Sequence, residues 1–253
     1  MPLQCGIVGL PNVGKSTLFS AMVKRQVPAD AYPFTTIEPN VGIVQVSDNR
    51  LNKLAEILQP ERIIPTTLRI VDIAGLIKGS HHGEGLGNQF LGQIREVDAI
   101  IHIVRCFTSK QVTHITPDLD PVRDIEIVKT ELILKDLDTV SRLMEKVSKK
   151  AQSGDASTTK ELTYLETISL HLDGGKPARE LTLDEQGQEF LRDLSLITSK
   201  PVLYVGNENE DEATSHDLRA VAKNLTDWGK ENGQEVIILS AALENELAFL
   251  EDE

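Results

Sequence analysis

The 253-residue sequence is poor in cysteine and has no long apolar runs, and these absences exclude several classes of protein. Its two cysteines, Cys5 and Cys106, lie in apolar stretches without partners at metal-ligand spacing, which indicates reduced core thiols and not a disulfide framework or zinc site. No apolar run approaches the roughly 18 residues needed to cross a bilayer, and the start, MPLQCGIVGL, has no signal-peptide pattern. We therefore expect a cytoplasmic protein that does not associate with membranes.

Basic charge is also scarce, because 26 Lys and Arg face 39 Asp and Glu, a formal net charge of -13. This balance argues against a protein that coats nucleic acid, DNA included, through its overall field, and is compatible only with a localised contact with RNA. The hydrophobic content of 40% is enough for a sizeable core. The composition therefore favours a folded protein over a globally disordered one.

Short β-branched runs alternate with longer amphipathic runs, which is typical of an α/β fold with parallel strands joined by crossover helices. We expect helices after the first loop, after HHGEGLGN and around HDLRAVAKNLTDWGKE. The strands are expected at LQCGIVG, NVGIVQV, TTLRIVD, AIIHIV, PVLYVGN and EVIILS.

The fourth and fifth of these strands are too far apart for one crossover helix, which needs about a dozen residues plus short loops. Two helical patterns fill the interval, separated by the polar stretch QSGDASTTK, and predict an antiparallel coiled hairpin. We expect a first part of the sheet-forming domain at 1–120, the helical insertion at 121–198 and the second part of that domain at 199–253. That these helices simply extend the domain remains an alternative. The apolar positions are Leu134, Leu137, Val140, Met144, Val147 and Ala151, then Leu162, Leu165, Ile168 and Leu172.

The stretch GLPNVGKST, residues 9–17, lies between a strand and a helix and matches the G-x-x-x-x-G-K-[ST] phosphate-binding loop. Glycines allow backbone N–H groups to close around phosphates, Lys15 places an ammonium on the β and γ phosphates, and the Ser16 hydroxyl ligates Mg²⁺. The pattern predicts a P-loop nucleoside triphosphatase of the GTPase type. The nucleotide contacts expected here are Asn12, Val13, Gly14, Lys15, Ser16 and Thr17.

A triphosphate site also needs a carboxylate at the end of a neighbouring strand, and TLRIVDIAGL provides Asp72 as a further metal residue. Gly75 leaves a backbone N–H for the γ-phosphate, and the glycine-rich KGSHHGEGLGN suits a segment that orders with that phosphate. In AYPFTTIEPN, Thr35 and Thr36 are candidate metal ligands, of which Thr36 is preferred. Simple turn chemistry is the alternative for this pair.

Six stretches together resemble the YchF/Obg-like ATPase family: GLPNVGKST, YPFTTIEPN, VDIAGLIKG, GEGLGNQFL, PVRDIEIV and GNENED. The resemblance runs over the whole chain. It implies a GTPase-type P-loop domain with a coiled-coil insertion, ATP as the substrate, and association with the ribosome, at its large subunit or ribosomal RNA. It also implies a C-terminal TGS domain, whereas the sequence ends at LENELAFLEDE, so we expect a truncated form.

The base is expected to contact Asn207, Glu208 and Glu210 of GNENED, where GTP-specific relatives carry Asn-Lys-x-Asp. An aspartate that accepts two hydrogen bonds from guanine can discriminate by about 10⁴ to 10⁵ fold, and the extra methylene of Glu210 spoils that fit. Loss of guanine selectivity follows from this argument, and preference for adenine is what the resemblance implies. The pocket is expected to close at Ser240 and Ala241.

Leu76 stands after DIAG, where many GTPases carry a glutamine that orients water, so another group must assist hydrolysis. His114 is at the position that the resemblance indicates as catalytic, with Lys15 and Gly75 at the phosphates, while His81 and His82 are weaker candidates. Asn12 matches the arrangement of potassium-activated relatives, which predicts a K⁺ ion beside the phosphates. Three functions remain open: a ribosome-associated ATPase switch, a GTP-specific GTPase and a nucleotide-dependent scaffold.

Overall fold

The computed structural model describes residues 2–24, 40–73, 94–108, 118–151, 156–209 and 216–250. The chain divides into two units. The sheet unit comprises Met1–Gly75, Val97–Pro121 and Val202–Glu253, and the helical unit comprises Leu76–Glu96 and Val122–Pro201. The helical unit thus includes a segment before the fourth strand, in addition to the region expected as the insertion. The predicted domain bounds, with an insertion at 121–198, stay a prediction.

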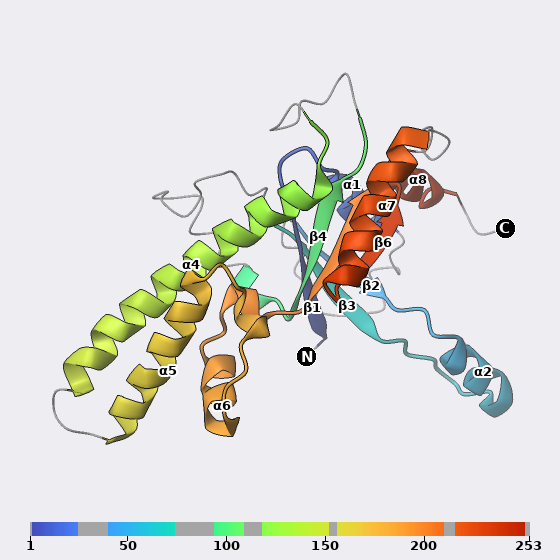
Figure 1. Cartoon of the computed structure of the whole chain (residues 1–253). Coiled ribbons are helices and arrows are strands. Elements are labelled where there is room, and N and C mark those ends of the chain that lie inside the picture. The colour runs from blue at the N-terminus through green and yellow to red at the C-terminus, as the bar shows by residue number, and fades with distance from the viewer. Residues whose placement is uncertain are drawn as a thin grey trace. The chain divides into compact units, whose positions relative to one another are not determined.

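Within the described residues, the sheet unit contains a six-stranded sheet of order β2-β3-β1-β4-β5-β6 (Figure 1). Valine and isoleucine favour extended backbone and fill its core, with Ile7, Ile70 and Ile103 almost fully buried. All six expected strands are therefore present. Their bounds are Leu3–Val8 for β1, Val41–Gln45 for β2, Thr67–Asp72 for β3, Ala99–Arg105 for β4, Val202–Asn207 for β5 and Glu235–Leu239 for β6.

The sheet is mixed, whereas the sequence pattern predicted parallel pairing. β1 runs parallel to β3 and β4, and β4, β5 and β6 continue in parallel, but β2 pairs antiparallel with β3. β2 and β3 pair antiparallel because the arm between them reverses the chain, so that the two strands lie side by side without a crossover connection.

That arm carries α2, Asn49–Leu58, which the sequence analysis did not predict. Asp48 caps its first turn by accepting a hydrogen bond from the N–H of Arg50 at 2.8 Å. Gln59 ends the helix in the left-handed conformation, with its N–H donating to the carbonyl of Ala55 at 2.9 Å. Local capping therefore defines a helix that has no buried residue.

Helices cover both faces of the sheet. A side chain at Gly206 would meet Leu225 of α7, His216–Glu231, so α7 covers that face. Successive residues of a strand point to opposite faces, and Asn207 accordingly contacts the loop before α1, Lys15–Lys24, and the start of α8, Ala241–Leu247. The fold is that of an α/β P-loop protein.

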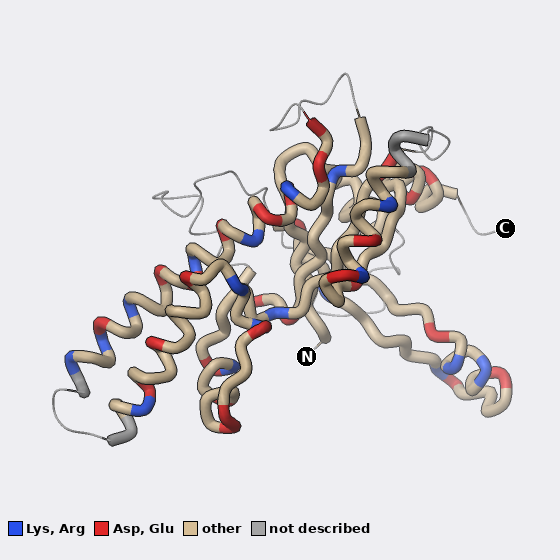
Figure 2. Tube along the Cα trace, in the orientation of Figure 1, with Lys and Arg blue, Asp and Glu red and all other residues tan. Residues whose placement is uncertain are grey.

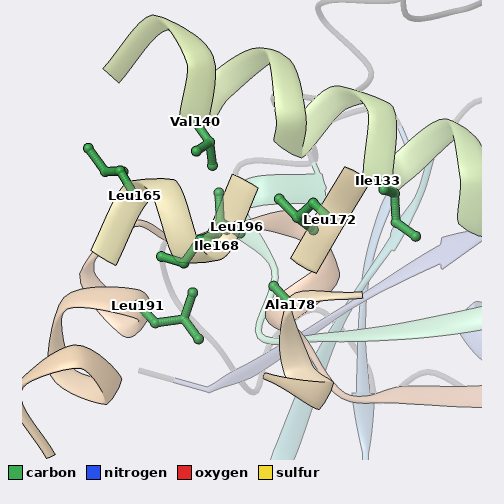
Figure 3. Close-up of a cluster of buried hydrophobic side chains, with 8 residues drawn as sticks. All are labelled: Ile133, Val140, Leu165, Ile168, Leu172, Ala178, Leu191 and Leu196. Carbon is green, nitrogen blue, oxygen red and sulfur yellow. The ribbon is translucent and has the colours of Figure 1, made fainter. Parts of the chain in front are cut away.

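The helical unit is built on α4, Pro121–Ala151, α5, Ala156–Asp173, and α6, Glu185–Asp193. One buried apolar cluster joins these helices to the short 3-10 turn Ala178–Glu180 and to Leu196, the residue that precedes the 3-10 turn Ile197–Ser199 (Figure 3). α5 starts inside QSGDASTTK, which was expected to be a linker, and α6 was not predicted. The coiled-coil geometry stays a prediction. The cluster consists of Ile133, Val140, Leu165, Ile168, Leu172, Ala178, Leu191 and Leu196.

A buried carboxylate, Asp136, links α4 to the 3-10 turn Ile197–Ser199 within the helical unit. Asp136 of α4 accepts hydrogen bonds from the backbone N–H groups of Ile197 at 2.9 Å and Thr198 at 2.7 Å, and from the Thr198 hydroxyl at 2.7 Å. The same hydroxyl accepts from the N–H of Ala178 at 3.0 Å. Burial raises the pKa of Asp136, and the bonds from Thr198 oppose that shift.

Charges of both signs are interspersed along α4 and α5 (Figure 2). Two pairs on α4 are Lys129 with Glu126 and Arg142 with Asp138, the latter at 3.6 Å. Among the described helices, none combines the length and the apolar character that a membrane crossing requires.

Candidate functional site

The loop between β1 and α1 turns tightly at Gly9 and Gly14. A Cβ at Gly9 would overlap the carbonyl oxygen of Ile103, and one at Gly14 would overlap the side-chain amide of Asn207. Gly14 has φ +100°, a conformation that side chains rarely adopt. The glycines of the motif are therefore required both by close packing and by backbone geometry.

Asn12 lies at the tip of this loop with φ 63°. Asparagine tolerates the left-handed conformation better than most residues because its short polar side chain can hydrogen-bond locally. The next residue, Val13, is buried, and Thr17 is exposed in the first turn of α1.

Lys15 is buried at the start of α1, with 8% of its surface exposed. Its Nζ donates hydrogen bonds to the carbonyl oxygens of Leu10 at 2.8 Å and Gly9 at 3.2 Å. Burial lowers the pKa of Lys15, and the Asp72 carboxylate opposes this shift. The loop therefore encloses a cation beside the backbone N–H groups of a helix N-terminus, which is a phosphate-binding arrangement.

Ser16 and Asp72 meet between the start of α1 and the end of β3. The Ser16 hydroxyl donates to Asp72 Oδ2 at 2.9 Å. Hydroxyl and carboxylate oxygens are ligands that Mg²⁺ accepts, and Mg²⁺ takes its other ligands from water and substrate phosphates. No cluster of three His, Cys, Asp or Glu side chains that could hold a metal occurs in the part of the chain that is described. This donor pair therefore fits a phosphate-bound Mg²⁺ better than a metal held by protein alone.

Asn207 ends β5 and joins two loops. Its Nδ2 donates to the carbonyl of Val13 at 2.9 Å, and its Oδ1 accepts from the N–H of Ala241 at 2.8 Å. Ser240 caps α8 by accepting a hydrogen bond from the N–H of Leu243 at 3.3 Å. Asn207, Ser240 and Ala241 are thus brought together with the phosphate-binding loop at one edge of the sheet.

The segment after Asn207 is held on both sides. The N–H of Glu208 donates to the carbonyl of Leu239 in β6 at 2.9 Å. On the side of β4, Asn209 Nδ2 donates to the carbonyl of Thr108 at 3.2 Å. The sequence analysis missed Asn209, although its place inside the stretch GNENED was a signal.

Several predicted site residues lie outside the described residues. These are Thr35, Thr36, Gly75, Leu76, His81, His82, His114 and Glu210. Their predicted roles stay predictions.

Comparison with known proteins agrees with this geometry. Residues 4–136 match the family model described as "50S ribosome-binding GTPase". The chain is 46% identical over 253 residues to "Ribosome-binding ATPase YchF" of Haemophilus ducreyi and 44% identical to that of Bacillus subtilis, covering all of this chain and 69% of each relative.

Similarity in three dimensions points the same way. The structure titled "Structure of the Schizosaccharomyces pombe YchF GTPase" superposes with a TM-score of 0.82 at 35% identity, over 99% of this chain and 68% of that one. The resemblance inferred from the six sequence stretches is therefore confirmed, and the chain belongs to the YchF family.

Proposed function

We propose that this chain binds and hydrolyses ATP at the carboxyl edge of its sheet, as a nucleotide-dependent switch that acts with the ribosome. The observation that carries the proposal is the convergence of Lys15, Ser16 and Asp72 on one loop and helix N-terminus. Relatives at 44–46% identity are named ribosome-binding ATPases. We place the protein in the cytoplasm, where its ribosomal partner is found.

The residues of the loop act mainly by position and charge. Lys15 neutralises the β and γ phosphate oxygens, and the N–H groups at the start of α1 bind the phosphates. Ser16, Asp72 and Thr36 would hold Mg²⁺, which would supply charge neutralisation at the γ-phosphate. Gly75 donates its N–H to the γ-phosphate. Asn207 fixes the phosphate-binding loop relative to the residues of the base pocket, because it hydrogen-bonds to Val13 and to Ala241.

A GTP-specific GTPase is the second candidate, because the names of the family model and of the solved relative both contain the word GTPase. Competition between ATP and GTP, measured by titration calorimetry, separates the two. We expect ATP to bind at least as tightly as GTP. A preference for GTP of a hundredfold or more would reject the ATPase proposal. Changing Glu208→Lys together with Glu210→Asp restores the guanine motif and is expected to move the selectivity toward GTP.

The ribosomal part of the proposal has its own test. Co-sedimentation with purified large ribosomal subunits is expected with a non-hydrolysable ATP analogue and weaker with ADP. If binding is the same with both nucleotides, the protein is a scaffold whose hydrolysis is incidental.

We propose that His114 assists the attack of water, since Leu76 has no hydrogen-bonding group. His114→Ala is expected to reduce hydrolysis by about tenfold or more while ATP affinity changes little, because the group acts in the transition state. Loss of affinity in proportion to rate, or an unchanged rate, would contradict this role. The intrinsic turnover itself is expected to be slow, at about 10⁻⁴ to 10⁻² per second without a partner's arginine.

A further inference from the structure

The turn that follows β4, Cys106 to Thr108, is restrained at each of its residues. β4 and β5 end at the same level, with Arg105 opposite Asn207. Beyond this pair the N–H of Cys106 donates to the carbonyl of Asn207 at 2.8 Å. Asn209 then holds the Thr108 carbonyl at 3.2 Å, so that a side chain continues the pairing after the strands have ended.

Arg105 restrains the middle of the same turn. The arginine is buried, with 3% of its surface exposed, and its Nε donates to the carbonyl of Phe107 at 2.9 Å. The guanidinium also lies over the Phe107 ring, 4.4 Å from its centroid. One side chain therefore fixes both the backbone and the ring of Phe107.

This turn lies at the edge where open α/β sheets bind ligands, outside the carboxyl ends of their parallel strands. Asn207 contacts the phosphate-binding loop from β5, and the 106–108 turn is its neighbour at the end of β4. The turn is thus placed beside Asn207 and Asn209, in the segment proposed to read the base. β4 also pairs with β1, the strand that leads into the phosphate-binding loop, so the test below separates an effect on the base from one on the phosphates.

We propose that Asn209 and Arg105 are positioning residues for the purine base, which hold the 106–108 turn as one wall of the base pocket. The inference rests on the proposed nucleotide-binding function. A wall that is already ordered before the ligand arrives lowers the entropic cost of binding a planar base, and so contributes to affinity for the base and not for the phosphates.

The test compares Asn209→Ala with Asn232→Ala. Both asparagines donate through Nδ2 to a backbone carbonyl, Asn209 to Thr108 and Asn232 to Trp228 at 2.8 Å. Asn232 precedes β6, at the end of the strands opposite to the ligand edge, so it is a matched control. The probes are ATP, GTP and inorganic tripolyphosphate, with Mg²⁺, in titration calorimetry.

Asn209→Ala is expected to weaken ATP about three- to tenfold, the equivalent of one hydrogen bond, and to change the ratio of ATP to GTP affinity. Tripolyphosphate affinity is expected to stay at the parent value, because the Asn207 bond to Val13 is retained. Asn232→Ala is expected to change none of these affinities. Arg105→Lys keeps the charge but loses the Nε–H, and is expected to resemble Asn209→Ala.

Equal weakening of ATP and tripolyphosphate by Asn209→Ala, or no change in either, overturns the positioning role. If instead the parent protein binds ATP no more tightly than tripolyphosphate, the proposed recognition of a nucleotide has failed, and the two failures are distinguished. Asn209 is only partly buried, so its variant tests the proposal even where Arg105→Lys does not fold.

Discussion

The sheet unit and the helical unit both bury polar side chains, but these side chains have different roles. In the sheet unit, Lys15 and Asn207 hydrogen-bond to the phosphate-binding loop at the carboxyl ends of the parallel strands, where open α/β sheets bind ligands. In the helical unit, the Asp136 carboxylate accepts hydrogen bonds from two backbone N–H groups and one hydroxyl of the same unit. A buried polar side chain alone therefore does not indicate a functional site. Its position at the carboxyl ends of the parallel strands does.

The largest expected effect is on the apolar cluster of the helical unit. Leu165 has no exposed surface, and Leu165→Ala is expected to cost about 2–5 kcal/mol of local unfolding free energy, through lost burial and a remaining cavity. Hydrogen exchange of α5 amides measures this. Leu170→Ala on the same helix is the control, because Leu170 is 77% exposed. A loss of ATP affinity in Leu165→Ala would contradict the view that the helical cluster and the nucleotide site act independently.

The converse change acts on the sheet unit. Lys15→Ala removes a charge at the phosphates and is expected to lower ATP hydrolysis at least about a hundredfold, or about 2.7 kcal/mol in the barrier. Hydrogen exchange of α5 is expected to remain at the parent level. The control is Lys53→Ala on α2, an exposed lysine. Retained hydrolysis in the Lys15 variant would contradict the assignment of the loop.

Asp136→Asn tests the architectural role of the buried carboxylate. The amide cannot accept all three hydrogen bonds, and a cost of about 1–3 kcal/mol in the helical unit is expected. Asp138→Asn is the control, since Asp138 forms a surface pair with Arg142.

The pH dependence of that variant has a defined sign. Because the folded pKa of Asp136 is raised, its contribution to stability is complete below the pKa of the unfolded chain and is lost as pH rises through the folded pKa. The gap in unfolding free energy between parent and Asp136→Asn is therefore expected to widen as the pH is lowered. A gap that narrows toward acid would show that the carboxylate is stabilised in its charged form.

The smallest effect is expected for a monovalent cation at the sheet unit's loop. We propose that Asn12 helps to bind K⁺ beside the phosphates, so that hydrolysis runs a few times faster in potassium than in sodium buffer. Asn12→Gly keeps the left-handed backbone at φ 63° and removes only the side chain, and is expected to abolish the difference. Equal rates for the parent in both buffers would count against the potassium site, and Asn12 would then only stabilise the turn.

The strands and the phosphate-binding loop were predictable because each has a strong local signal. Alternating β-branched runs locate all six strands, and glycine spacing around Lys15 locates the loop. What the sequence pattern missed depends on tertiary context. α2 is short and set by its caps at Asp48 and Gln59, and the antiparallel pairing of β2 follows from the arm that α2 occupies.

The same limit applies to the site. Asn207 was predicted from its motif, but its two bonds to Val13 and Ala241 join residues far apart in sequence. The contribution of Asn209 and Arg105 lies in a turn whose partners come from another strand. Such contacts are set by how β4 and β5 end together, and no local pattern encodes that register.

The pairing of β4 with β5 also has a consequence for the order of folding. These neighbours in the sheet are roughly a hundred residues apart in the chain, and closing so long a loop is entropically costly and slow. The Asp136 bonds bring α4 to within a few residues of the start of β5, so a helical unit that forms first shortens the free chain to be closed. Assembly of the nucleotide-binding edge is therefore expected to follow, in time, the folding of the helices inserted between its strands.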